Sequence, residues 1–286
     1  MQPSVASPPR WWLWPTILSL DAPAVVVLWQ VVLARSASVG TTRPEAIVLA
    51  SSVWLSYSAD RWIEGWRLAP DRVRTHRHRF HQDWRWPMLG VWVAVLCVDV
   101  FEAAHGLPRR EFWAGALLLV PVAAYLFLHQ LVHRHSRWRP PKEACVALLL
   151  GVGAALFAAA NPVADVRGMA APFALFTLLC FSNCALISVW EDEVDRSHGG
   201  TSLALQFTRA GALLRALPWA VSGAAAAIWL GAVPHAGPAA ACAAASGALL
   251  GLLGLAEPRI GRVPARVLAD VALLTPAAWL AVFGSQ

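Results

Sequence analysis

The segment ALPWAVSGAAAAIWLGAVPHAGPAAAC, residues 216–242, contains no Asp, Glu, Lys or Arg, and segments of this kind decide the fold. A bilayer has a hydrocarbon core of about 30 Å, which a helix of about 20 residues can cross, so this segment is long enough to span it. Hydrophobic residues make up 58% of the chain and charged residues 14%, whereas a soluble domain carries about 25% charged residues. A soluble protein of this composition would need a core larger than its polar residues can cover. The composition therefore predicts an integral membrane protein.

Apolar segments of similar length recur along the chain, with polar breaks between them. They predict an all-α, polytopic transmembrane bundle of about nine helices that forms a single domain over residues 1–286. The first segment contains Asp21 and has no signal-peptidase pattern, so we expect it to be a retained helix. Thr42 and Glu45 form a capping box that predicts the start of the second helix. The expected helices cover residues 12–34, 45–66, 86–104, 111–132, 143–160, 169–190, 211–232, 238–256 and 265–284.

Basic residues gather in the breaks after the second, fourth, sixth and eighth helices, and the other breaks hold few. The positive-inside rule therefore predicts that these four breaks and the N-terminus are cytoplasmic, in the inner (cytoplasmic) membrane of the cell. The net charge of +6 does not indicate a nucleic-acid partner, because basic loops and the 16 tryptophans near helix ends are what bilayer interfaces select. We expect membrane lipids, and no nucleic acid, as partners; the oligomeric state stays open.

Two acidic clusters stand at the predicted cytoplasmic ends of the second and sixth helices. The first is Ser56-Tyr-Ser-Ala-Asp60-Arg-Trp-Ile-Glu64, and the second is Trp190-Glu191-Asp-Glu-Val-Asp195-Arg-Ser-His-Gly199. In each cluster two carboxylates lie four residues apart, which places them on one helix face. Carboxylates near hydrocarbon usually face a wet cavity or an ion.

These carboxylates are candidate ligands for Mg²⁺, because Mg²⁺ is normally held by a few carboxylates and by substrate phosphates. Two such pairs facing one another would hold a diphosphate through bridging magnesium ions. In the alternative interpretation they are interfacial carboxylates neutralised by arginines. The candidate catalytic and metal-binding residues are Asp60, Glu64, Glu191 and Asp195, and the neutralising arginines would be Arg61, Arg67 and Arg196.

The placement of these clusters resembles that in the UbiA-type intramembrane prenyltransferases, which have nine transmembrane helices and a cavity facing the cytoplasm. The family's second motif, D-x-x-x-D-x-x-x-G at the end of helix six, is matched by Glu191, Asp195 and Gly199, with Glu in place of the first Asp. Its first motif, N-D-x-x-D-x-x-x-D at the end of helix two, is matched only in part. Ser56 and Tyr57 replace its Asn and first Asp, Asp60 matches, and Glu64 replaces the third Asp.

A third similarity is Pro141-Lys142-Glu143 before a helix that contains Gly151 and Gly153, although Glu143 replaces a basic residue of the family. The resemblance implies an Mg²⁺-dependent transfer of a prenyl group from an isoprenoid diphosphate to a lipid-soluble aromatic or quinone-precursor acceptor. It implies as alternatives a terpene cyclase, or a non-catalytic binding or assembly protein that kept the fold. The diphosphate would be bound by Tyr57, Arg61, Arg67, Lys142 and Arg196.

Three further aspartates lie in or near apolar segments, and the sequence assigns none of them a direct role. Asp270 is expected to cap the start of the last helix at the interface, and Asp99 to lie at the external interface. Asp21 is expected to approach the cavity from the first helix. Gly247 and Gly251 form a G-x-x-x-G pattern, which predicts close packing of the eighth helix against a neighbour.

Overall fold

The computed structural model describes residues 8–67, 75–128, 141–197, 202–207, 209–233 and 235–283, and these residues form helices and no strand. A 3₁₀ turn (Trp11–Leu13) precedes the α-helices, which are α1 (Trp14–Ile17), α2 (Asp21–Ser36), α3 (Arg43–Arg67), α4 (His76–Asp83), α5 (Arg85–Gly106), α6 (Arg109–Phe127), α7 (Lys142–Ala160), α8 (Val166–Trp190), α9 (Asp192–Ser197), α10 (Leu203–Gln206), α11 (Gly211–Leu230), α12 (Gly237–Ile260), α13 (Arg262–Ala272) and α14 (Thr275–Phe283).

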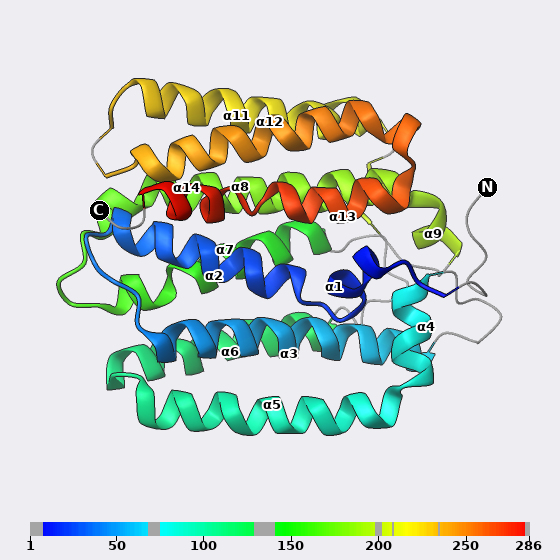
Figure 1. Cartoon of the computed structure of the whole chain (residues 1–286), viewed down its shortest axis with the longest axis horizontal. Coiled ribbons are helices and arrows are strands. Elements are labelled where there is room, and N and C mark those ends of the chain that lie inside the picture. The colour runs from blue at the N-terminus through cyan, green and yellow to red at the C-terminus, as the bar shows by residue number, and fades with distance from the viewer. Residues whose placement is uncertain are drawn as a thin grey trace.

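The long helices run side by side along the longest axis of the molecule (Figure 1). Within the described residues, seven spans are long and apolar enough to cross a membrane, with α13 and α14 forming one of them. The pair of α1 and α2, bent by 72°, brings the number to eight. Helix α3 is also long, with 25 residues, but its polar residues keep it outside that group. Together these segments correspond to the nine helices that the sequence predicts.

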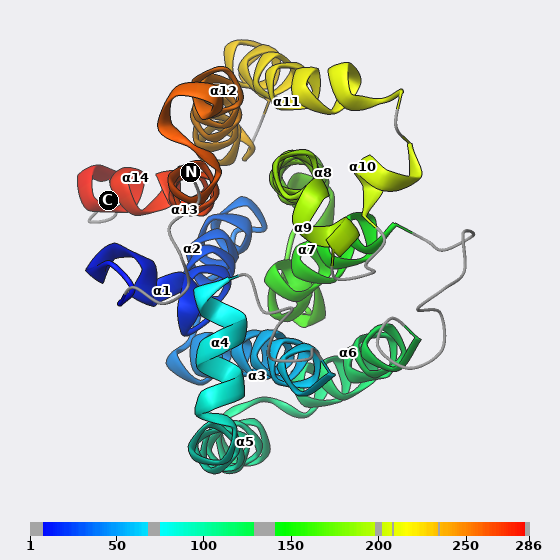
Figure 2. The ribbon, with the colours of Figure 1, turned by 90° about the vertical axis from the view of Figure 1, so that its right-hand side faces the viewer.

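Helix α2 lies at the centre of the bundle, where it contacts α3, α7, α8, α12, α13 and α14. Its Trp29 is fully buried and stacks on Phe176 of α8 at 4.8 Å between ring centroids. Helices α5 and α6 lie at the outside of the bundle, next to α3 (Figures 1 and 2). Only 6% of the apolar window of each is buried, and large apolar side chains are exposed along both. Such a surface requires lipid, so the chain is a multi-pass membrane protein.

Two of the predicted continuous helices are broken. The first expected helix, residues 12–34, breaks before Asp21, where Ser19 has a positive φ of 56°. The carbonyl of Leu18 at this break accepts a hydrogen bond from Trp54 Nε1 over 2.9 Å. Because a helix break frees backbone carbonyls, an indole donor from a neighbouring helix keeps this one satisfied.

The last expected helix, residues 265–284, breaks between α13 and α14. Pro276 has no N–H to donate to the carbonyl of Ala272, and the N–H of Ala277 donates to the Leu274 carbonyl. The carbonyl of Leu273 therefore accepts from Trp29 Nε1 over 2.9 Å. The predicted boundaries of this helix are therefore right within a few residues, while its continuity is wrong.

Two local predictions are confirmed. Thr42 and Glu45 hydrogen-bond at the start of α3, with 2.9 Å between Thr42 Oγ1 and Glu45 Oε1. Gly247 of α12 packs so closely on α11 that an added Cβ would lie 2.8 Å from the carbonyl oxygen of Pro218. Helices α11 and α12 approach each other because this position has no side chain.

Candidate functional site

The predicted site residues come to one end of the bundle, shown at the right of Figure 1 and facing the viewer in Figure 2. At this end α3 finishes, α4 and α9 cross the bundle, and α13 begins. Helices α3, α6, α8 and α12 all end here, so the helix ends that precede the four basic breaks share one side, as the sequence predicts. Three predicted ligands or phosphate-binding residues, Glu64, Arg67 and Asp195, have side chains that lie outside the described residues.

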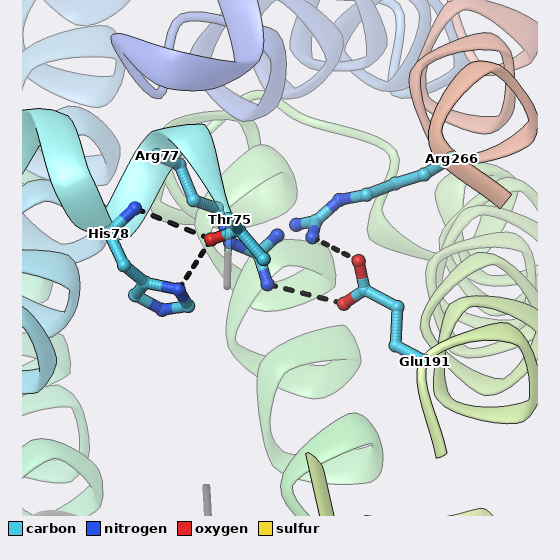
Figure 3. A network of polar contacts seen from close by, with 5 residues as sticks. All are labelled: Thr75, Arg77, His78, Glu191 and Arg266. Carbon is cyan, nitrogen blue, oxygen red and sulfur yellow. Dashed lines mark hydrogen bonds and ion pairs between the residues drawn. The ribbon is translucent and has the colours of Figure 1, made fainter. Parts of the chain in front are cut away.

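Glu191 is held by two arginines from distant parts of the chain (Figure 3). Its Oε2 lies 3.2 Å from Arg77 Nη2 of α4, and its Oε1 lies 2.7 Å from Arg266 Nη1 of α13. The three side chains are mostly buried, with exposed fractions of 17% for Glu191, 10% for Arg77 and 14% for Arg266. Charge-assisted hydrogen bonds are strong where water is largely excluded. We call this group the Glu191 ion cluster.

The Glu191 ion cluster bears on the alternative interpretation of the acidic residues. The sequence named Arg61, Arg67 and Arg196 as neutralising partners, but Glu191 meets Arg77 and Arg266. Each of its oxygens already accepts from an arginine, so a metal ion would have to share the carboxylate with these two cations. Its neighbours also meet arginines: Asp192 lies 3.9 Å from Arg196, and Glu193 lies 2.7 Å from Arg262.

Polar contacts within helix α4 and its N-cap stabilise this helix. Thr75 caps it by accepting from the backbone N–H of His78, and the Nδ1 of His78 lies 2.6 Å from Thr75 Oγ1 (Figure 3). His81 is buried, and its Nδ1 lies 3.0 Å from the carbonyl oxygen of Arg77. Burial lowers the pKa of His81, and the nearby positive charges of Arg61 and Arg77 lower it further.

The remaining predicted residues lie along the inner side of this end. Asp60 and Arg61 are half-buried on α3, and Arg61 acts electrostatically on both His81 and Asp270 of α13. Lys142 begins α7 and acts on Cys184 of α8, so it faces the bundle interior. Tyr57 lies one turn before Asp60 on the same helix.

Glu143, which departs from the family pattern, has a structural contact. Its side chain is buried and accepts a hydrogen bond from the backbone N–H of Leu203 over 3.0 Å. Leu203 is the first residue of α10, so Glu143 ties the segment after α9 to the start of α7.

The donor chemistry of the proposed ligands fits Mg²⁺, because carboxylate oxygens are the ligands it prefers. Among the described residues, however, no three His, Cys, Asp or Glu side chains gather closely enough to hold a metal ion. Since Glu64 and Asp195 are not among the described side chains, the predicted four-carboxylate set stays a prediction.

A search of solved structures places this arrangement among known ones. The chain is similar to the apo structure of a UbiA homolog from Aeropyrum pernix K1, with a TM-score of 0.59 and 19% sequence identity. The similarity covers 93% of this chain and 98% of the homolog. This chain has the UbiA fold. No model of a known protein family matches its sequence, and no curated protein does.

The candidate site lies where the helix ends and the cap helix α4 meet, and it has two features that the sequence did not reveal. Arg77 and Arg266 were counted only as loop charges, since no local pattern links either one to Glu191. Asp21 and Asp270 were considered separately, whereas their carboxyl groups lie within hydrogen-bond reach of each other. The only sign of this contact in the sequence is that both aspartates lie in segments that are otherwise apolar.

Proposed function

We propose that this protein is a UbiA-like transferase that moves a prenyl group from an isoprenoid diphosphate to a lipid-soluble aromatic or quinone-precursor acceptor. The observation that carries the proposal is the gathering of Asp60, Arg61, Lys142 and the Glu191 ion cluster at one end of a UbiA-fold bundle. Cations fixed at this end would stabilise the charge that develops on the diphosphate as the C–O bond breaks. The apolar interior of the bundle would hold the prenyl chain.

In this proposal Mg²⁺ would supply Lewis-acid neutralisation of the diphosphate, with Asp60, Glu64 and Asp195 as its ligands and Glu191 as a fourth. Arg77 and Arg266, which hold Glu191, would also bind phosphate oxygens. Lys142 would bind the diphosphate from α7, and Tyr57 would donate a hydrogen bond to it. Arg196 is two-thirds exposed beside Asp192, so it would meet the diphosphate only as it enters.

The proposal is tested by incubating membranes that contain the protein with allylic diphosphates of several chain lengths and Mg²⁺. The release of pyrophosphate and the lipid products are both measured. Release that depends on an added phenolic or quinone-precursor acceptor supports transfer. Release with a hydrocarbon product and no acceptor supports the cyclase alternative.

The matched variants are Asp60→Asn at the site end and Asp165→Asn at the opposite end, where Asp165 caps α8. We expect Asp60→Asn to lower pyrophosphate release by about a hundredfold or more, and Asp165→Asn to leave it unchanged. If no diphosphate releases pyrophosphate, and Asp60→Ala and Asp195→Ala cells function normally, both enzyme proposals are wrong. The non-catalytic alternative then stands.

The proposal also places the site end on the cytoplasmic side of the inner membrane. Isoprenoid diphosphates are charged and water-soluble at one end, so they would reach the site from the cytoplasm. A reporter active only outside the cytoplasm, fused to the C-terminus after α14, should be active. An inactive reporter there, with an active one after α12, would show that the orientation is the reverse of the proposed one.

A further inference from the structure

We infer that Asp21, Asn183 and Asp270 form a site that binds the neutral hydroxyl group of a phenolic acceptor and accepts its proton. This inference rests on the proposed function, because it assigns the acceptor to a place in the same bundle. The three residues come from α2, α8 and α13, and these three helices contact one another.

The break between α1 and α2 places Asp21 at the first position of α2. Its Oδ1 accepts from the backbone N–H of Ala22 over 3.0 Å. The N-terminus of a helix carries a partial positive charge, which favours a carboxylate at this position. A continuous first helix would have left Asp21 without this backbone donor.

Asp270 of α13 meets Asp21 of α2. Its Oδ1 accepts from Asn183 Nδ2 over 2.9 Å, and its carboxyl group lies within hydrogen-bond reach of that of Asp21. Two carboxylates have no donor between them, so the pair must hold one proton. Two acids that share one proton leave one negative charge, and hence room for one more proton.

Asn183 provides the observation that points to a ligand. Its side chain is only 8% exposed, its Nδ2 is committed to Asp270, and its Oδ1 has no hydrogen-bond partner. A buried acceptor left without a donor costs about 1–3 kcal/mol. The amide that touches the aspartate pair therefore has an acceptor for a donor that the protein does not supply.

Asp270 and Tyr57 are surrounded by protein atoms, yet each keeps part of its accessible surface, so a ligand group can reach them. Tyr57, Cys180 and Cys184 lie near Asp270 and add neutral polar groups beside the aspartate pair. A neutral hydroxyl, which both donates and accepts, fits beside this pair, whereas an anionic ligand group would be repelled by its charge.

The distance of Asp270 from the end of the bundle suits a residue that binds the acceptor. Asp270 follows Arg266 by four residues on α13, so both share one face and Asp270 lies about 6 Å further from the end of the bundle. A diphosphate bound at the Glu191 ion cluster would place its allylic carbon toward the aspartate pair. The acceptor ring would then lie between the allylic carbon and the aspartate pair.

The reaction balances with the allylic diphosphate, the phenol and the aspartate pair. The C–O bond of the allylic diphosphate breaks, and its electron pair leaves on the diphosphate. A ring carbon of the phenol bonds to the allylic carbon while the hydroxyl proton passes to the carboxylate of the aspartate pair, which gives a neutral dienone. The diphosphate that has left takes the proton from the alkylated carbon of the dienone, the electrons of that C–H bond restore the aromatic ring, and the aspartate pair returns a proton to the oxygen and so regains its one-proton state.

The test separates diphosphate binding from capture. Stabilisation by an allylic diphosphate alone, measured as the melting temperature in detergent, and formation of prenylated phenol are compared in wild type, Asp21→Asn and Asp270→Asn. Asp99→Asn is the matched control, because Asp99 is a carboxyl of α5 that accepts from Ser51 and Ser52 elsewhere in the bundle. We expect both site variants to keep the stabilisation by the diphosphate and to lose prenylated phenol by about a hundredfold. An equal loss of both readouts, or no loss of prenylated phenol, overturns the inference.

A binding measurement decides the inference even if the wild type releases no pyrophosphate. The melting temperature of the purified protein in detergent is compared with 4-hexylphenol and with its methyl ether, which lacks the donor. The phenol should stabilise the wild type more than the ether does, and Asn183→Leu and Asp270→Asn should remove the difference. Equal shifts with phenol and ether in the wild type would contradict the site, whereas failed catalysis with a preserved difference contradicts only the transfer reaction.

Discussion

Arg266 of α13 donates a hydrogen bond from Nη1 to Glu191 Oε1 over 2.7 Å, and so connects the last membrane span to the segment after α8 (Figure 3). Arg77 of α4 occupies the other oxygen of Glu191. The cap helix α4 is therefore attached to the bundle through a carboxylate that the family resemblance assigns to metal binding. In this structure the Glu191 carboxylate contributes to the stability of the fold.

Replacing Glu191 tests that contribution. Glu191→Gln keeps the size of the side chain but removes the carboxylate that two largely buried guanidinium groups share. We expect a loss of about 2–3 kcal/mol in unfolding free energy, measured by denaturant titration in detergent, because removing one partner of a largely buried ion pair is costly. The control is Glu193→Gln, since Glu193 pairs with Arg262 at the exposed surface and should matter little.

The interaction between Glu191 and Arg266 can be measured in a double-mutant cycle. Arg266→Gln alone should also destabilise, and the double variant Arg266→Gln with Glu191→Gln should lose less than the sum of the two. Additive losses would show that Glu191 and Arg266 do not interact in solution.

His81 predicts a pH dependence. Because burial and the charges of Arg61 and Arg77 lower its pKa in the folded state, the unfolded chain binds a proton first as the pH falls. Its contribution to stability is therefore present above the ordinary histidine pKa of about 6.5 and declines as the pH falls through that value toward the lower folded-state pKa.

The measurement is the melting temperature at neutral pH and at about pH 5.5. The fall on acidification should be smaller in His81→Gln than in wild type. His105→Gln is the matched control, because His105 makes the same contact with the carbonyl four residues earlier but is exposed on α5. An identical fall in wild type and His81→Gln would exclude this role.

The close approach of α11 and α12 predicts a sharp difference between two glycines. Gly247→Ala forces a methyl group against the Pro218 carbonyl and the Ser222 N–H, at 2.8 and 2.9 Å. We expect a loss of about 1–3 kcal/mol in unfolding free energy. Gly223→Ala on α11 meets nothing within 4 Å and should be neutral or slightly stabilising. Equal effects of the two substitutions would mean that the helices are further apart than described.

The broken last span predicts a role for one indole N–H. Trp29→Phe keeps an aromatic ring against Phe176 but removes the donor to the Leu273 carbonyl. We expect a loss of about 1–2 kcal/mol, because the carbonyl is left unsatisfied in a buried position. Trp62→Phe removes a similar bond to the Arg85 carbonyl at an exposed position and should cost less. A cost for Trp62→Phe as large as that for Trp29→Phe would contradict this account.

The sequence predicts the helices well because length, apolar content and charge are local properties. The capping box at Thr42 and the glycines of α12 are local too, and both predictions are confirmed. The helix breaks were not predicted, since Pro23 and Pro276 are compatible with a continuous membrane helix when neighbours supply donors. Here the donors are Trp54 and Trp29, whose partners only tertiary structure reveals.

The sequence predicted the location of the candidate site better than it predicted which side chains pair there. The acidic clusters at the ends of two helices place the site at one end of the bundle. The pairing of Glu191 with Arg77 and Arg266 joins residues 114 and 75 positions away, and no spacing rule connects them. Asp21 and Asp270 are equally remote in the chain. Each looks like an isolated interfacial aspartate until the central helix brings the two together.

The Glu191 ion cluster also has a consequence for how the protein is made. Arg77 and Glu191 leave the ribosome well before Arg266, which belongs to the last membrane span to be synthesised. The cluster can therefore close only after that span has inserted beside α2 and α8. Until then Glu191 lacks Arg266, one of its two arginine partners, so a chain truncated before α13 would hold α4 through an incomplete cluster when it meets quality-control proteases.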